Sequence, residues 1–106
     1  MNTRIEHDLL GQMTLPADSW YGIQTQRAVD NFAITGVPMN RFPALIRALA
    51  MVKAAAAHAN LKLCLLESHK AHAILAACAD IAEGELHEAF VVDMIQGGAG
   101  TSTNMN

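Results

Sequence analysis

Apolar residues dominate the middle of the chain with the spacing of an α-helix. The segment from Pro43 to about Leu63 consists almost entirely of good helix formers, and Pro43 suits the first helical position because its missing N–H is not needed there. A helix that is apolar on most sides is buried on most sides, so we expect it to need more covering protein than the rest of a 106-residue chain provides. Its two apolar stripes are Leu45, Leu49, Val52, Ala56 and Ala59, and Ile46, Ala50, Ala54 and Ala57.

Three further segments have recognisable patterns. A second helix is predicted from about Ser68, as the N-cap, to Glu83, with Gly84 as a left-handed stop. Helical spacing also predicts a short helix over residues 22–32. Residues 4–15 alternate loosely around a glycine, which indicates a short extended or hairpin-like arm. The predicted class is therefore mainly α, in one domain, and the buried stripe of the second helix is predicted to be Ala71, Ile74, Leu75, Cys78 and Ile81.

Composition narrows the class of protein. Charged residues make up only 16% of the chain, below the usual quarter of a soluble domain, which indicates a surface partly intended for burial against other protein. The net charge is −3 and the seven Lys and Arg residues are scattered, so no nucleic acid partner is expected. Arg47, Lys53 and Lys62 interrupt the longest apolar region, so no membrane span is predicted. The charged N-terminal segment is unlike a secretory signal, and a cytoplasmic location is expected.

Histidine and cysteine residues are the first candidates for chemistry. His69 and His72 lie three residues apart in the second predicted helix, a spacing that can share a metal ion. The next turn on that face offers no acidic or cysteine ligand, so both are interpreted as exposed residues and no metal is expected. Cys64 and Cys78 fit neither a common zinc pattern nor a disulfide framework.

The segment QGGAGTSTNMN, residues 96–106, has the composition of a binding loop. It lacks the lysine of a P-loop and the strand–turn–helix context of a dinucleotide site. One interpretation is a flexible tail. The other is that the three glycines let the backbone bend tightly and approach a ligand, while Thr101, Ser102 and Thr103 place hydroxyl groups where a helix could begin. Free N–H groups at a helix start suit a carboxylate or a phosphate.

Four blocks of the sequence resemble the N-terminal part of the aspartase/fumarase superfamily. They are RIEHDLLG, LPADSWYGIQTQRAVDNF, MVKAAAAHAN and QGGAGTSTNMN, and together they cover essentially the whole chain in the order and spacing of that family. The block from Tyr21 to Arg27 is shared with class II fumarases and does not discriminate. Fumarases typically carry serine and glutamine at the positions of Ala99 and Ser102, so the last block is more similar to aspartate ammonia-lyases.

The resemblance implies that residues 1–106 are a mainly α N-terminal domain of a homotetrameric lyase. Such enzymes convert L-aspartate to fumarate and ammonia without a cofactor. A base removes a proton from the carbon beside the β-carboxylate, and an aci-carboxylate forms before the amine leaves. Gly100, Thr101 and Ser102 match the positions that bind the substrate carboxylate, with Thr101 expected as the main donor and Gly100 allowing close approach. Asn104 is expected to hold the loop.

The resemblance also implies that the rest of the active site lies elsewhere. The family's catalytic base is a serine in a pattern near SSxMPxKxN, which these residues lack, so no catalytic residue is assigned here. The family's central helical bundle and C-terminal domain are absent too, and the chain is expected to be a fragment that is inactive alone. Three alternatives stay open: a class II fumarase acting on malate, a small-anion binding module, and a non-catalytic interaction module that packs on partner helices.

Overall fold

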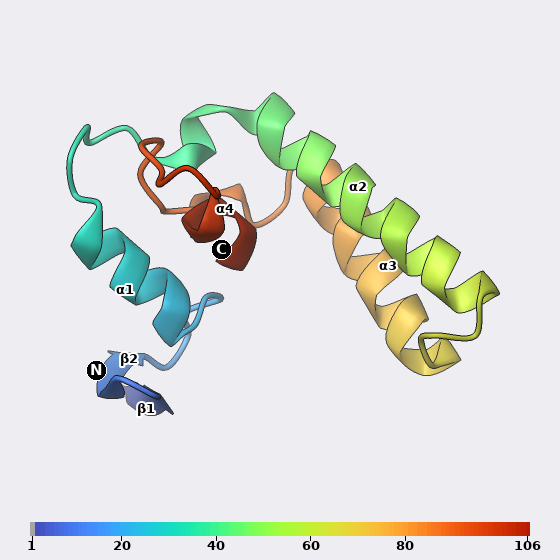
Figure 1. Cartoon of the computed structure of the whole chain (residues 1–106), viewed down its shortest axis with the longest axis horizontal. Helices are drawn as coiled ribbons and strands as arrows, with labels where there is room; N and C mark the ends of the chain where they lie inside the picture. Colours follow the sequence, from blue (N-terminus) through green and yellow to red (C-terminus); the bar gives the residue numbers. More distant parts are fainter. Residues whose placement is uncertain (1) are drawn as a thin grey trace. The chain divides into compact units, whose positions relative to one another are not determined.

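The computed structural model describes residues 2–106, which form two compact units. The first unit comprises the chain up to Arg41 together with Glu88–Asn106, and the second comprises Phe42–His87. Helices predominate over the chain as a whole (Figure 1), which confirms the mainly α prediction. Within the described residues, none of the helices combines the length and the apolar character that a membrane crossing requires.

The first unit begins with an antiparallel hairpin of β1 (Thr3–Asp8) and β2 (Gly11–Pro16), as the alternation around Gly11 predicts. Gly11 has a φ of 123°, a conformation that glycine adopts without a steric penalty. The Asp8 side chain closes the turn, because its Oδ1 accepts the N–H of Leu10 at 2.9 Å. The hairpin is therefore formed by local signals at its turn.

The first turn of helix α1 (Ile23–Asn31) contacts the carboxylate of Glu6, a residue of the hairpin. The Oε1 atom of Glu6 accepts the N–H of Ile23 at 2.9 Å and so satisfies a donor of the first turn. Gly22 gives this carboxylate its room, because a Cβ at Gly22 would lie 2.8 Å from the same oxygen. Arg4 holds Glu6 from the other side at 2.7 Å and donates to the carbonyl oxygens of Pro16, Ala17, Ser19 and Tyr21.

The last part of the first unit pairs with the segment that follows α1. The N–H of Met39 donates to the carbonyl of Val92 at 2.8 Å, and the N–H of Met94 donates to Val37 at 2.9 Å. Met39 and Val92 are both 1% exposed and belong to the core of this unit. The short 3-10 helix η1 (Met39–Arg41) overlaps the paired residues of the first segment, and η2 (His87–Ala89) directly precedes those of the second. The paired residues, 37–40 and 90–94, form a platform for the loop that leads to α4 (Thr101–Met105).

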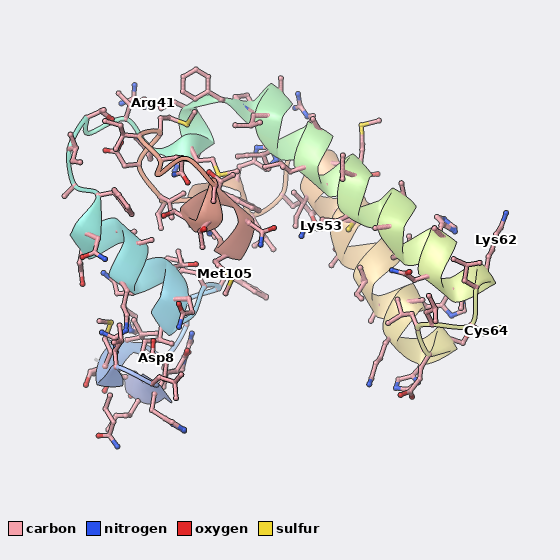
Figure 2. All side chains as sticks on the ribbon, in the orientation of Figure 1. Asp8, Arg41, Lys53, Lys62, Cys64 and Met105 are labelled. Carbon is pink, nitrogen blue, oxygen red and sulfur yellow. The ribbon has the colours of Figure 1, made fainter. Side chains whose placement is uncertain are left out.

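The second unit is a pair of helices, α2 (Pro43–Lys62) and α3 (Ser68–Ala82), which lie side by side in Figure 1. Both helices end within one residue of the predicted positions. The prediction of Ser68 as the N-cap is wrong by one residue, because Glu67 keeps an extended backbone and Ser68 is the first helical residue. Gly84 follows α3 with a φ of 105°, as a glycine stop predicts. Cys64 lies in the turn between the helices (Figure 2) with a φ of 59°.

Only one of the two predicted apolar stripes of α2 is buried within the described residues. The buried stripe contains Ile46, Ala50 and Ala57, whereas Val52 on the other stripe is 65% exposed. This agrees with the expectation that the helix needs more covering protein than the chain provides, since a pair of helices covers only the facing stripe of each member. For the same reason Ile74 of α3, predicted to be buried, is 40% exposed.

Candidate functional site

The segment from Gln96 to Asn106 forms a tight loop that ends in α4. Gly100 is the N-cap residue of α4 and adopts the left-handed conformation, with φ 66° and ψ 27°. Its N–H donates to the carbonyl of Gly97 at 3.1 Å, and its own carbonyl accepts the N–H of Asn104 at 3.1 Å. A helix therefore does begin at Thr101, where the run of hydroxyl residues indicated that one could begin.

Thr101 and Ser102 occupy the first two positions of α4 and differ in exposure. Thr101 is exposed, whereas Ser102 is only 9% exposed. Among residues 2–106, no side chain or backbone group forms a hydrogen bond with the Thr101 hydroxyl. A Cβ added at Gly97, Gly98 or Gly100 would meet no atom within 4 Å. The loop therefore presents its backbone and the Thr101 hydroxyl to open space.

Thr101 and Ser102 also line a cavity of about 210 Å³ within the first unit. The opposite wall comes from α1 and the residue after it, so two sequence blocks that lie far apart in the chain meet here. Met105, labelled at the end of α4 in Figure 2, also lines the cavity. The cavity combines hydroxyl, amide and guanidinium groups with apolar side chains, and its other lining residues are Leu10, Gln24, Arg27, Ala28, Asn31 and Phe32.

The guanidinium of Arg27 is already paired with a carboxylate. Its Nε atom lies 2.9 Å from Asp8 Oδ2, and its Nη2 atom lies 2.9 Å from Asp8 Oδ1, which makes a bidentate pair. The hydrogen bonds from Arg27 lower the pKa of the Asp8 carboxyl. Gln24 of α1 donates to the same carboxylate at 2.8 Å. Asp8, labelled on the hairpin in Figure 2, therefore connects β1 to the face of α1 that lines the cavity.

Asp93 anchors the platform from which the loop departs. Its carboxylate accepts the N–H groups of Ile95 at 2.8 Å, Thr35 at 2.9 Å and Gly36 at 3.1 Å, and the Thr35 hydroxyl at 2.8 Å. These donors, led by the N–H of Ile95, lower the pKa of Asp93 from 3.8 to about 2. The side chain is an Asx-type turn residue whose partners join two segments far apart in sequence.

We expect Asp93→Asn to remove an acid-dependent part of the stability. Because the folded-state pKa of about 2 lies below the ordinary 3.8, the carboxylate stabilises the fold fully above about pH 4, and this contribution is lost as the pH falls toward 2. The variant should melt below the parent at pH 7, and its Tm should fall less steeply between pH 4 and pH 2. Melting curves of the full-length protein across this range provide the test, with the exposed Asp18→Asn as the control. Parallel declines in parent and Asp93→Asn would contradict the assignment.

The side-chain amides of Gln96 and Asn106 hold the two ends of the loop. From the sequence, Asn106 is expected only to add an amide group to a possible anion site, and Gln96 has no expected role. Asn106 Oδ1 accepts the N–H groups of Val91 at 2.8 Å and Val92 at 3.3 Å, and its Nδ2 donates to the carbonyl of Ala89 at 3.0 Å. No local pattern could have revealed these contacts, because the partners lie 14 to 17 residues away.

The two histidines considered for a metal lie on α3, in the second unit. Both are exposed, and the Nδ1 atom of His69 lies 3.5 Å from Oε2 of Glu67. Within residues 2–106, no group of three or more His, Cys, Asp or Glu side chains is arranged to hold a metal ion.

Similar proteins were found by sequence and by structure. The aspartate ammonia-lyase of Pseudomonas aeruginosa is 61% identical over 105 residues, which are 99% of this chain and 22% of that protein. The class II fumarate hydratase of Halobacterium salinarum is 48% identical over 103 residues, 97% of this chain and 22% of that protein. A fumarate lyase:delta crystallin from Brucella melitensis superposes with a TM-score of 0.93 at 59% identity, covering 98% of this chain and 24% of that one.

The chain thus spans about a fifth of the length of these relatives. Residues 11–106, which include β2, α1 and the loop that carries Thr101, also match the model of a protein family described as Lyase. The match includes every residue that lines the cavity except Leu10. The chain therefore belongs to this lyase family, within the aspartase/fumarase superfamily.

Proposed function

We propose that this chain is the N-terminal domain, residues 1–106, of an aspartate ammonia-lyase, which converts L-aspartate to fumarate and ammonia. The observation that carries the proposal is the 61% identity to an aspartate ammonia-lyase, against 48% to a class II fumarate hydratase, over almost the same residues. Ala99 and Ser102, where fumarases typically carry serine and glutamine, support the same choice.

In this function, the loop binds a carboxylate of the substrate. Thr101 offers an exposed hydroxyl at the first position of α4, Ser102 follows it at the cavity wall, and Gly100 provides the left-handed turn that precedes them. Removing a proton beside a carboxylate places negative charge on that carboxylate in the transition state. A donor fixed before the reaction stabilises that charge without reorganisation, and such donors are the largest single source of rate enhancement in many enzymes.

The rest of the machinery is proposed to come from other parts of the enzyme. No residue of this chain is proposed as the catalytic base, and the chain covers only 22% of the related ammonia-lyase. The proposed enzyme is a homotetramer, without a cofactor, in which further helices cover the exposed stripe of α2 with Leu45 and Val52. A cytoplasmic location agrees with the two free cysteines, one of which, Cys64, is exposed.

The test is a steady-state assay of the full-length protein that contains these residues. Purified enzyme is given L-aspartate or L-malate, and the release of fumarate and ammonia is followed. We expect fumarate and ammonia in equal amounts from L-aspartate, with a kcat/KM far above that for L-malate. The reverse preference would establish the fumarase alternative, which the 48% identical relative favours. Turnover of neither substrate would favour an anion-binding or interaction module instead.

A further inference from the structure

One side chain connects the platform to the first turn of α4. The Nε2 atom of Gln96 donates to the backbone carbonyl of Asp93 at 2.9 Å, and its Oε1 atom accepts the backbone N–H of Thr103 at 3.1 Å. Both bonds are partly buried. Gln96 therefore spans the glycine-rich stretch and joins its two ends, so that the path of residues 97–102 does not depend on the flexible glycines alone.

The two groups that Gln96 joins are themselves well placed. The residue that supplies the carbonyl, Asp93, is held by four donors to its carboxylate and by the bridge to Pro38. The N–H that Gln96 accepts belongs to the third residue of α4, one of the first-turn donors that a helix cannot satisfy internally. A bond at this position orients the whole first turn, and that turn carries Thr101 and Ser102.

We propose that Gln96 is a positioning residue, which holds the Thr101 hydroxyl in the direction of the substrate carboxylate by bridging Asp93 and Thr103. This inference rests on the proposed ammonia-lyase function. Gln96 does not touch the substrate; it acts through the backbone of α4. A misplacement of about 1 Å at a reacting group can cost about 100-fold in rate, and a donor that acts on charge developing in the transition state affects kcat more than substrate binding.

The test compares three variants in the full-length enzyme. Gln96→Met keeps the length of the side chain and removes both hydrogen bonds, whereas Gln96→Glu keeps an oxygen acceptor for the Thr103 N–H and loses the donor to Asp93. Gln12→Met is the matched control, because Gln12 is an exposed residue of β2. The readouts are kcat and KM for L-aspartate, the inhibition constant of succinate, which is a dicarboxylate that cannot react, and Tm.

We expect Gln96→Met to lower kcat about 10- to 100-fold, with a smaller weakening of succinate inhibition and little change in Tm. Gln96→Glu should recover part of that loss, and Gln12→Met should match the parent. An unchanged kcat in Gln96→Met, or a Gln96→Glu variant no better than Gln96→Met, would overturn the inference. So would a kcat loss matched by equal losses in succinate binding and Tm, which indicates a merely structural role. If Gln96→Met does not fold, kcat and succinate binding are compared between Gln96→Glu and the parent, and the same criteria apply.

The inference and the proposed function fail separately. A parent enzyme without activity on L-aspartate would contradict the proposed function before any variant is compared. An active parent whose kcat does not respond to Gln96→Met would leave the function standing and remove only the role of Gln96.

Discussion

Thr101→Val is expected to lower kcat of the full-length enzyme on L-aspartate by about 10²- to 10³-fold, the cost of removing one preorganised donor from a developing oxyanion. Valine has nearly the same shape as threonine but lacks the hydroxyl. Because Thr101 is exposed and its hydroxyl has no hydrogen-bond partner among residues 2–106, the substitution breaks no hydrogen bond within the described chain. The Tm should therefore stay close to that of the parent.

The control for this prediction is Thr14→Val, the same substitution at an exposed position of β2. It should leave kcat and KM unchanged. Steady-state kinetics of the two variants, with melting curves for each, separate a lost donor from a damaged fold. Near-parental kcat in Thr101→Val would remove Thr101 from the site, and a large fall in Tm would mean that the hydroxyl serves the fold instead.

Gly22→Ala is expected to destabilise the first unit by about 1 kcal/mol, the low end of the usual range for overpacking, because the atom in the way is the end of a side chain. The backbone at Gly22 has a φ of −107°, so any residue can adopt it, and the cost comes from space alone. The added Cβ would lie 2.8 Å from Oε1 of Glu6. That oxygen cannot move away easily, because Arg4 and the N–H of Ile23 hold the carboxylate from two directions.

A double-mutant cycle with Glu6→Ala isolates this cause. If the Glu6 carboxylate is the obstacle, Gly22→Ala should cost much less in the Glu6→Ala background than in the parent. Urea denaturation of the parent, the two single variants and the double variant measures the coupling. Equal costs of Gly22→Ala in both backgrounds would show that another contact limits this position.

The elements that sequence predicts well are those with local signals. The run of helix formers behind Pro43 marks α2, Gly11 marks the hairpin turn, and the change from glycine to hydroxyl residues marks the start of α4 at Thr101. Each of these signals acts within a few residues of the chain. The choice between the two stripes of α2 has no such signal, since both are apolar and only the neighbouring helix decides which is buried.

The candidate site shows the same division between local signals and contacts that depend on distant parts of the chain. Thr101 and Ser102 could be predicted as candidate site residues from a motif, because their proposed role belongs to one short segment. The groups that hold that segment could not, because they depend on contacts between distant parts of the chain. Arg27 reaches Asp8 across 19 residues, and the carboxylate of Asp93 accepts the N–H of Thr35 across 58. Sequence pattern predicts which residues of the loop are candidates to face a ligand, and the structure is needed to find the residues that hold the loop in place.

The central claim is that the segment from Gly100 to Ser102 binds a carboxylate of the substrate. The most direct test is a crystal structure of the full-length enzyme with succinate bound. The account predicts one carboxylate of succinate within hydrogen-bonding distance of the Thr101 hydroxyl, about 2.5–3.0 Å between oxygen atoms, at the cavity between α1 and α4. Succinate bound elsewhere, with the Thr101 hydroxyl facing solvent, would contradict it.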